Sequence, residues 1–205
     1  MSWAPQYCSI DDLKSWLEID TTADDVELLF AIEAASRAID KATNRQFGQV
    51  DTPEHRYYRA EYDQRHHRWI IETDDLMTHA GLAVALDNCD GTWTTVTDFE
   101  LTPRNALQKG RPWTAIEITR PPVAPTGIAK VTAKWGWAQP VPYAILLATM
   151  LQAGRLFARR EDASSGPPLI QKTVDDIDYK WGTPSPLDDD VLTSVAPYRR
   201  YWGAV

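Results

Sequence analysis

The chain has 205 residues, enough for one elaborated domain or two small ones and for a core that needs no disulfide bonds or metal ions. Its formal net charge of −8 argues against a protein that clamps nucleic-acid phosphates, because such proteins carry a basic footprint. The longest nearly apolar run, residues 141–151, is about half of the ~20 residues that a membrane span needs, so we expect a soluble protein.

The cysteines and tryptophans give further information on the kind of protein this is. Cys8 and Cys89 form no CxxC motif, which predicts two reduced thiols rather than a disulfide bond or a metal site. The first residues lack the basic and apolar regions of a signal peptide. Nine tryptophans indicate either an aromatic core or surfaces that a partner covers.

Two helices are predicted in the first 51 residues. Ser9 and Asp12 have the spacing of a capping box, which predicts a short helix over 10–18. Its apolar side is formed by Leu13, Trp16 and Leu17. A longer helix is predicted over 24–43. Its apolar residues recur at helical spacing: Val26, Leu29, Ile32, Ala35, Ile39 and Ala42.

From residue 52 to 134 the apolar pattern changes to a period of two, which predicts strands. The candidate strands lie around residues 57, 69–71, 82–86, 93–97, 99–101, 116–118 and 128–135. Turn signals separate them, among them Asp90–Gly91 and Lys109–Gly110. We therefore expect an antiparallel β-module inserted between helices.

A long apolar helix is predicted over 142–160, because Pro142 suits a first helical turn. The preceding Trp135-Gly136-Trp137 is expected to form a corner in which the glycine lets the chain turn. After Pro167 and Pro168 the pattern indicates a strand pair over 170–180, an acidic turn at 188–190 and a short terminal helix from about residue 191.

These elements predict an α+β fold, with a small bundle of three to four helices, an inserted antiparallel β-module and an extended C-terminal arm. The expected parts are N-terminal helices (1–51), the β-module (52–136), the core helix (137–166) and the arm (167–205). The arm either orders on contact with a partner or packs on its own subunit, and the sequence favours neither.

No catalytic or metal-binding motif is present in the sequence. His55, His66, His67 and His79 have no zinc-ligand spacing, and there is no P-loop, GxGxxG or GxSxG motif. We expect no cofactor, no metal site and no enzymatic activity. The alternatives are a small intracellular enzyme that uses His66 and His67 with nearby acidic residues, or a monomeric binding module.

Charge is distributed unevenly along the chain. The first 40 residues contain nine acidic and two basic residues, whereas Arg155, Arg159, Arg160, Arg199 and Arg200 lie near the C-terminus. One interpretation is that acids near helix starts and bases near helix ends each stabilise their helix by ~0.3–1 kcal/mol. The other is a head-to-tail oligomer in which the acidic face of one subunit meets the basic face of the next.

The order of these parts resembles a known family. Residues 7–17 read YCSIDDLKSWL, and residues 34–48 read AASRAIDKATNRQFG. A β-rich insert follows. Residues 131–138 then read VTAKWGWA and precede the apolar helix that ends in Arg159-Arg160-Glu161. This order is similar to that of the head-to-tail connector, or adaptor, proteins of long-tailed bacteriophages. The resemblance covers most of residues 7–166, and the insert is bulkier than in the smallest members of the family.

The resemblance implies a structural virion protein at the head-tail junction, assembled in the host bacterial cytoplasm. It implies a ring, commonly a dodecamer, that binds beneath the portal, extends the DNA channel and meets the next connector or tail protein. Double-stranded DNA would pass without specific binding, because an acidic channel repels phosphates. With the charge pattern, it predicts these residues at subunit or partner interfaces: Asp11, Asp12, Asp24, Asp25, Glu27, Arg155, Arg159, Arg160, Trp181, Tyr198, Arg199, Arg200, Tyr201 and Trp202.

Overall fold

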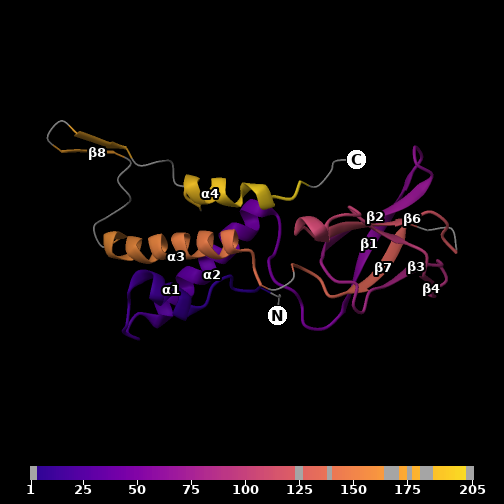
Figure 1. Ribbon diagram of the computed structural model, residues 1–205, viewed down its shortest axis with the longest axis horizontal. Coiled ribbons are helices and arrows are strands. Elements are labelled where there is room, and N and C mark those ends of the chain that lie inside the picture. Colours follow the sequence, from indigo (N-terminus) through magenta and orange to yellow (C-terminus); the bar gives the residue numbers. More distant parts are fainter. Residues whose placement is uncertain are drawn as a thin grey trace. The chain divides into compact units, whose positions relative to one another are not determined.

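The chain forms four α-helices and nine strands within the residues that its computed structural model describes, which are 4–122, 127–137, 140–163, 171–174, 177–180 and 187–201 (Figure 1). It divides into two compact units, one of Met1–Gln46 with Val141–Val205 and the other of Phe47–Pro140. The predicted α+β class, with helices in one unit and an antiparallel sheet in the other, is confirmed. The finer boundaries drawn from the sequence stay a prediction.

The helical unit contains α1 (Ile10–Leu17), α2 (Asp25–Thr43), α3 (Tyr143–Ala163) and α4 (Asp189–Val195). The Ser9 capping box begins α1, and α2 ends at Asn44 in the left-handed conformation. The backbone carbonyl of Pro142 accepts hydrogen bonds from the amides of Ile145 and Leu146, which confirms that the proline opens α3. In the described part of the chain, no helix has the length and apolar character that a membrane span requires.

Three helices share one apolar core. α2 and α3 pack against each other along their buried faces, with α1 against both. The core cluster consists of Cys8, Leu13, Leu28, Ala31, Ile32, Ala35 and Ala153. At Gly154 a Cβ would lie 3.1 Å from Leu17 Cδ2, so the absence of a side chain there lets α1 approach α3 closely.

The predicted core faces of α1 and α2 are partly wrong. Leu28 is buried in the core, whereas Val26 and Leu29, which were expected there, are exposed, and so is Trp16 on α1. Ile32, Ala35 and Ile39 are buried as predicted. The spacing of Val26, Leu29, Ile32 and Ala35 fits a helix, but it cannot distinguish the buried stripe from a second apolar stripe beside it.

The second unit is an antiparallel seven-stranded sheet of order β4-β3-β7-β1-β2-β6-β5 (Figure 1). Its strands are β1 (Glu54–Asp63), β2 (Arg68–Leu76), β3 (Ala83–Asp87), β4 (Trp93–Val96), β5 (Glu100–Thr102), β6 (Trp113–Ile118) and β7 (Ile128–Ala133). The seven strands coincide with the predicted segments, and β1 and β2 extend well beyond them. The separate hairpin of β8 (Gln171–Val174) and β9 (Ile177–Lys180) matches the predicted strand pair.

The sheet curls because β1 belongs to two ladders. Residues 54–59 pair with β7 and residues 60–63 pair with β2. Leu76, at the end of β2, forms a bridge to Trp135, just beyond the end of β7. The curled sheet buries one face, which includes Ile71, Leu86 and Ile116.

The Trp135-Gly136-Trp137 corner completes the core of this unit. The Trp135 ring is buried, donates its Nε1 hydrogen to the Glu54 carbonyl at 2.8 Å, and lies under the Arg56 guanidinium. Gly136 has a φ of 103°, which favours glycine, and its amide donates to the Asp75 carbonyl at 2.7 Å. The glycine therefore turns the chain as predicted, while the indole of Trp135 closes the sheet.

Candidate functional site

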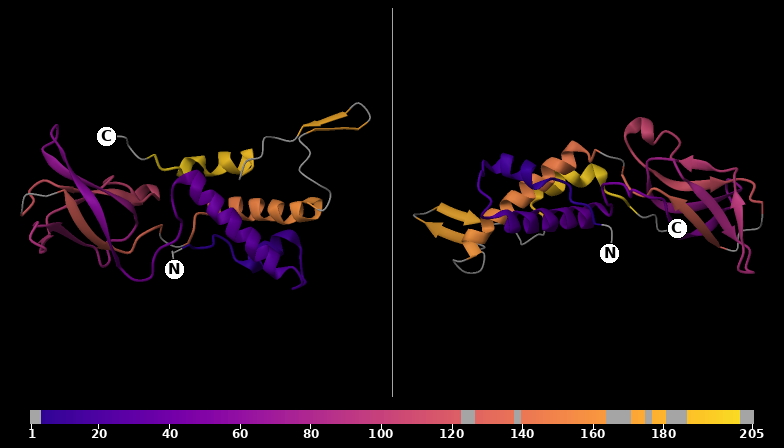
Figure 2. Two further views of the ribbon diagram at one scale, coloured as in Figure 1. Left: turned by 180° about the vertical axis from the view of Figure 1, so that it is seen from behind. Right: turned by 90° about the horizontal axis from the view of Figure 1, so that it is seen from below.

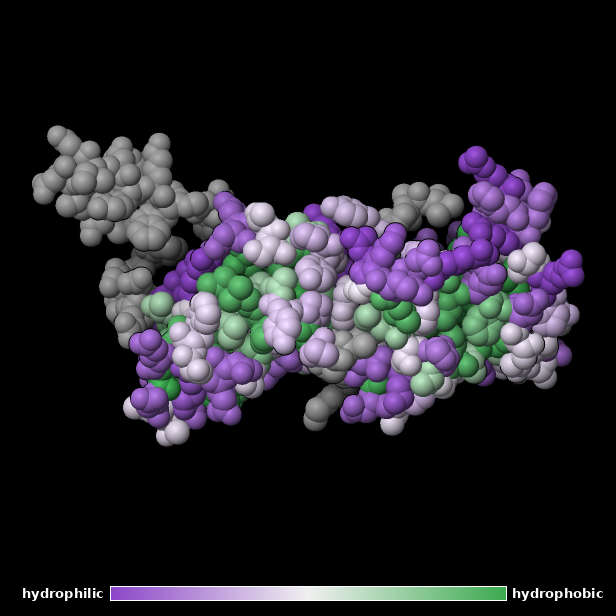
Figure 3. Space-filling model, viewed as in Figure 1, coloured by the Kyte–Doolittle hydropathy of each residue, from purple (hydrophilic) through white to green (hydrophobic). Residues whose placement is uncertain are grey.

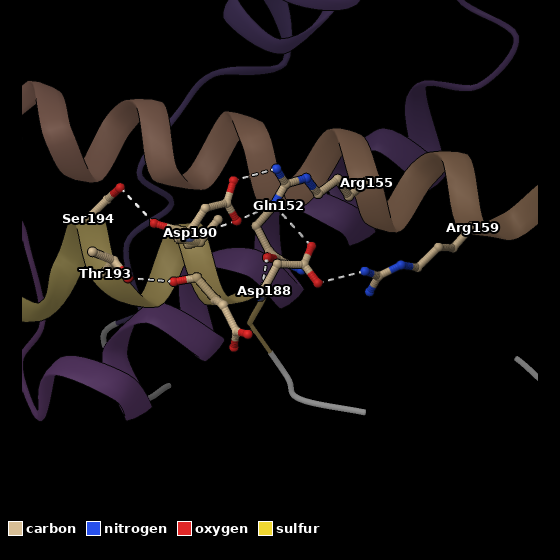
Figure 4. Close-up of polar contacts among 9 residues, drawn as sticks. Gln152, Arg155, Arg159, Asp188, Asp190, Thr193 and Ser194 are labelled. Atoms are coloured by element: carbon tan, nitrogen blue, oxygen red, sulfur yellow. Dashed lines mark hydrogen bonds and ion pairs between the residues drawn. The ribbon is translucent and has the colours of Figure 1, made fainter. Parts of the chain in front are cut away.

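The most elaborate polar cluster joins α3 to the beginning of α4. Arg155 on α3 binds Asp190 with both terminal nitrogens, at 2.7 and 2.6 Å, and contacts Asp188 at 3.2 Å. One turn further on, Arg159 binds the other oxygen of Asp188 at 2.7 Å (Figure 4). Two arginines spaced four residues apart thus face two aspartates spaced two apart, and we call these four residues the α4 clamp.

Apolar and neutral contacts accompany the clamp. The buried Gln152 side chain accepts the Asp188 amide hydrogen at 3.1 Å, and Figure 4 shows it beside the charged pairs. Leu187, Val191 and Val195 are buried. Beyond α4, the Arg200 amide donates to the Thr43 carbonyl at 2.7 Å. Residues 187–200 therefore pack on the α2–α3 pair of their own chain.

The electrostatics of the clamp favour both charged forms. Hydrogen bonds from Arg155 lower the pKa of Asp190 to about 2. The same pairing, with Asp188 adding to it, raises the pKa of Arg155 above its ordinary value. Because the carboxylate and the guanidinium both stay ionised over the whole physiological pH range, neither is suited to act as a general acid or base there.

A second charged contact joins the end of α3 to the start of α2. Arg160 lies 3.0 Å from Asp24 and 3.8 Å from Glu27, and its guanidinium stacks over Phe157. Nearby, Asp25 binds Lys14 of α1 at 2.9 Å. Three of the five arginines predicted at an interface, Arg155, Arg159 and Arg160, therefore have carboxylate partners within the chain.

The remaining predicted interface residues lie in different places. Asp11 and Asp12 are in the first turn of α1, and Asp12 forms the capping box with Ser9, whose hydroxyl lowers the pKa of Asp12 by hydrogen bonding. Arg199 stacks over the exposed Tyr201 ring. Tyr198 ends the 3₁₀ turn after α4, and the Arg200 side chain is buried. Trp181 and Trp202 lie outside the described residues.

The clamp was not predicted from the sequence. The acidic run 188–190 was interpreted as a turn or helix start, and Asp188 does occupy the N-cap position of α4. Its pairing with Arg155 and Arg159 joins residues about 30 positions apart. The available signal was the matched spacing of two arginines on the predicted core helix and two aspartates in the predicted acidic turn.

The histidines of the enzyme alternative lie in an exposed turn between β1 and β2. His66 Nδ1 lies 2.6 Å from Asp63 Oδ2, and His67 has the Tyr62 hydroxyl at 3.3 Å. Asp63 also accepts the amide hydrogens of Arg65 and His66, so it orders the turn itself. Among the described residues, no group of three or more His, Cys, Asp or Glu side chains is placed to hold a metal ion.

Comparison with known proteins gives a likeness of fold. The chain matches no protein-family model and no curated protein sequence. One solved chain is similar over 100% of this chain and 96% of its own, with a TM-score of 0.60 and 18% identity; its structure is described as the neck of an empty gene transfer agent particle computed with C6 symmetry.

A second solved chain comes from the virion of a native gene transfer agent particle. It is similar over 97% of this chain and 93% of its own, with a TM-score of 0.49 and 19% identity. That score is too low to support an argument. The first likeness shows that this chain shares its fold with a chain of that neck structure.

Proposed function

We propose that the chain is a structural, non-enzymatic protein of the neck of a phage-like particle, where it acts as a head-to-tail adaptor. The observation that carries this proposal is the likeness over the entire chain, helical unit and sheet unit together, to a chain of a gene transfer agent neck. The order of the sequence segments supports the same role independently.

In this proposal the chain assembles beneath the portal protein as a ring, which the family resemblance makes twelve-fold. The neck containing the similar chain was computed with C6 symmetry, which fits a closed ring of copies around an axis. The ring extends the DNA channel and presents a platform to the next connector or tail protein. A net charge of −8 suits a channel wall that lets DNA slide without binding it.

The charged and aromatic residues predicted from the sequence remain the proposed contacts with neighbouring subunits or the portal. The acidic candidates lie at the starts of α1 and α2, and the basic candidates lie in the second half of α3 and directly after the turn that follows α4. Since Arg155, Arg159 and Arg160 already bind carboxylates within the chain, their proposed contribution to a ring is a long-range attraction superimposed on these pairs.

The test is electron microscopy of the purified chain, alone and mixed with the portal protein of the same particle. We expect rings in at least the mixture, docked on one end of the portal. A chain that stays monomeric and does not join the portal contradicts the proposal. A His66→Ala, His67→Ala variant should assemble like the wild type, because both side chains lie in an exposed turn. Loss of a measurable turnover in that variant, with assembly intact, would instead favour an enzyme.

A further inference from the structure

The segment before α1 closes one side of the helical core. Residues 4–8 form neither helix nor strand, and they run alongside α2 to the start of α1 (Figure 2). We call these five residues the N-terminal strap. Its Tyr7 and Cys8 are buried, and Cys8 belongs to the apolar core of α1, α2 and α3. The surface over α1 is mostly hydrophilic in Figure 3, so the apolar core beneath it is covered.

The strap is fastened to one short stretch of α2 by hydrogen bonds that use side chains. The Tyr7 hydroxyl donates to Asp40 Oδ1, and the Tyr7 amide donates to Ser36 Oγ at 3.3 Å. Arg37 Nη2 donates to the Pro5 carbonyl at 2.5 Å, and the guanidinium lies 5.8 Å from the centroid of the Tyr7 ring. These contacts all fall on residues 36–40 of α2, so the strap can detach as one unit.

The helices keep partners of their own without the strap. The Ser36 hydroxyl donates to the Ile32 carbonyl within α2 at 2.8 Å. Arg37 forms ion pairs with Asp40 at 3.2 Å and with Glu33 at 3.7 Å, both along the same helix. The capping box that begins α1 lies within residues 9–12 and uses no strap residue. Detachment of the strap therefore leaves α1 and α2 with their ends and polar side chains satisfied.

Polar groups beneath the strap oppose the closed state, whereas burial of the Tyr7 ring favours it. Burial raises the pKa of Asp40 and Glu33 adds to the rise, although hydrogen bonds from Tyr7 and Gln46 and the charge of Arg37 oppose it. The ionised carboxylate is therefore held at a cost. Arg37 Nη1 is also buried, and in the described part of the chain no hydrogen bond satisfies it.

We propose that the N-terminal strap is a detachable closure of the helical core, which opens at Ser9 while the helices stay folded. The closed state predominates, and opening admits solvent to Cys8 by local rather than global unfolding. The strap is held least firmly when Asp40 is ionised. Because the raised pKa makes the closed state bind a proton more tightly than the open state does, closure strengthens as the pH falls through that pKa. This device does not depend on the proposed ring.

The two ends of one hydrogen bond provide the test, with Cys8 as the reporter. All proteins carry Cys89→Ser, so that Cys8 is the remaining thiol. The reaction of native Cys8 with 4,4′-dithiodipyridine is followed by absorbance, and its rate is divided by the rate in denaturant at the same pH. Tyr7→Phe and Asp40→Asn are compared with the parent protein. Tyr62→Phe is the matched control, because it removes a hydroxyl that contacts His67 in an exposed turn of the sheet unit.

The two variants should act in opposite directions. We expect Tyr7→Phe to speed the reaction of Cys8 about 5-fold, the equivalent of one hydrogen bond, because Asp40 stays charged and loses a donor. Asp40→Asn should slow it, because a neutral amide is buried at less cost than a carboxylate. Tyr62→Phe should leave the rate unchanged. In the parent protein the reaction should slow as the pH falls from about 7 toward about 4, and Asp40→Asn should lack this dependence.

Thermal unfolding of each protein separates local from global opening. A Cys8 that reacts only as fast as the whole protein unfolds would overturn the strap as a separate unit. Changes in the same direction in Tyr7→Phe and Asp40→Asn, or no change in either, would overturn the role of their contact. Each of these results would leave the proposed neck function standing.

Discussion

Arg155 makes three of the side-chain hydrogen bonds that join α3 to the C-terminal segment. Its two terminal nitrogens bind Asp190, and one of them also reaches Asp188 at the N-cap of α4. A planar guanidinium that binds a carboxylate with two parallel hydrogen bonds fixes direction as well as distance, which a lysine does not. The residue therefore orients α4 on α3 rather than merely attracting it.

The two cysteines differ in burial, and their reactivity should differ accordingly. Cys8 is buried in the helical core, and burial raises its pKa to about 11, whereas Cys89 is exposed in the turn between β3 and β4. Since the thiolate is the nucleophile, Cys8 stays protonated and protected at pH 8. We expect iodoacetamide to add one group to the native protein and two in denaturant, as measured by mass spectrometry.

A Cys89→Ser variant is the control and should take up no group in the native state. Above pH 9 the raised pKa also opposes folding, because the unfolded Cys8 thiol ionises before the folded one does. Labelling of native Cys8 at a rate similar to that of Cys89 would show that the N-terminal core opens readily.

At the scale of elements, α4 is short and depends on its contacts. Seven residues are too few for a helix that is stable alone, so its folding follows from Val191, Val195 and the α4 clamp. We expect Arg155→Gln to weaken the docking by about 1 kcal/mol, the upper range for exposed ion pairs, and so to speed amide exchange in α4 about 5-fold. Hydrogen–deuterium exchange with peptide resolution measures this.

Arg104→Gln is the matched control, because Arg104 forms an exposed ion pair with Glu100 in the sheet unit. Exchange in α4 should be unaffected by it. Equal protection of α4 in Arg155→Gln and the wild type would mean that Leu187, Val191 and Val195 alone hold the helix.

The sequence predicted where helices and strands lie better than it predicted how they pair and pack with one another. Capping at Ser9 and alternation in the β-module are local signals, and the helices and strands lie where these signals placed them. The strand order was not predictable, because β1 divides its residues between β7 and β2 through long-range pairing. Likewise, Val26 and Leu29 have the apolar character of core residues. Only the packing of α2 on α3 shows that Leu28 is buried in the core while Val26 and Leu29 are exposed.

At the scale of the whole molecule, the charge asymmetry serves contacts within the chain and, in the proposed ring, between chains. Arg159 and Arg160 bind Asp188 and Asp24 in the same copy, and these exposed pairs contribute little to folding, about 0–1 kcal/mol each. In the proposed ring, acidic side chains at these two positions would be repelled by the acidic start of a neighbouring α2. Reversal of these two charges should therefore affect assembly more than stability.

We expect an Arg159→Glu, Arg160→Glu variant, which keeps Arg155 in the α4 clamp, to lose its rings in native mass spectrometry while its thermal unfolding changes by only a few degrees. The reason is that four units of charge are removed from the basic end of α3, which then repels the five acidic residues in the 20–33 segment of the next copy. Lys41→Glu with Lys109→Glu changes the net charge equally at exposed positions elsewhere and should leave the rings intact. If both variants keep their rings, the arginines act only within the chain; if both lose them, total charge rather than position controls assembly.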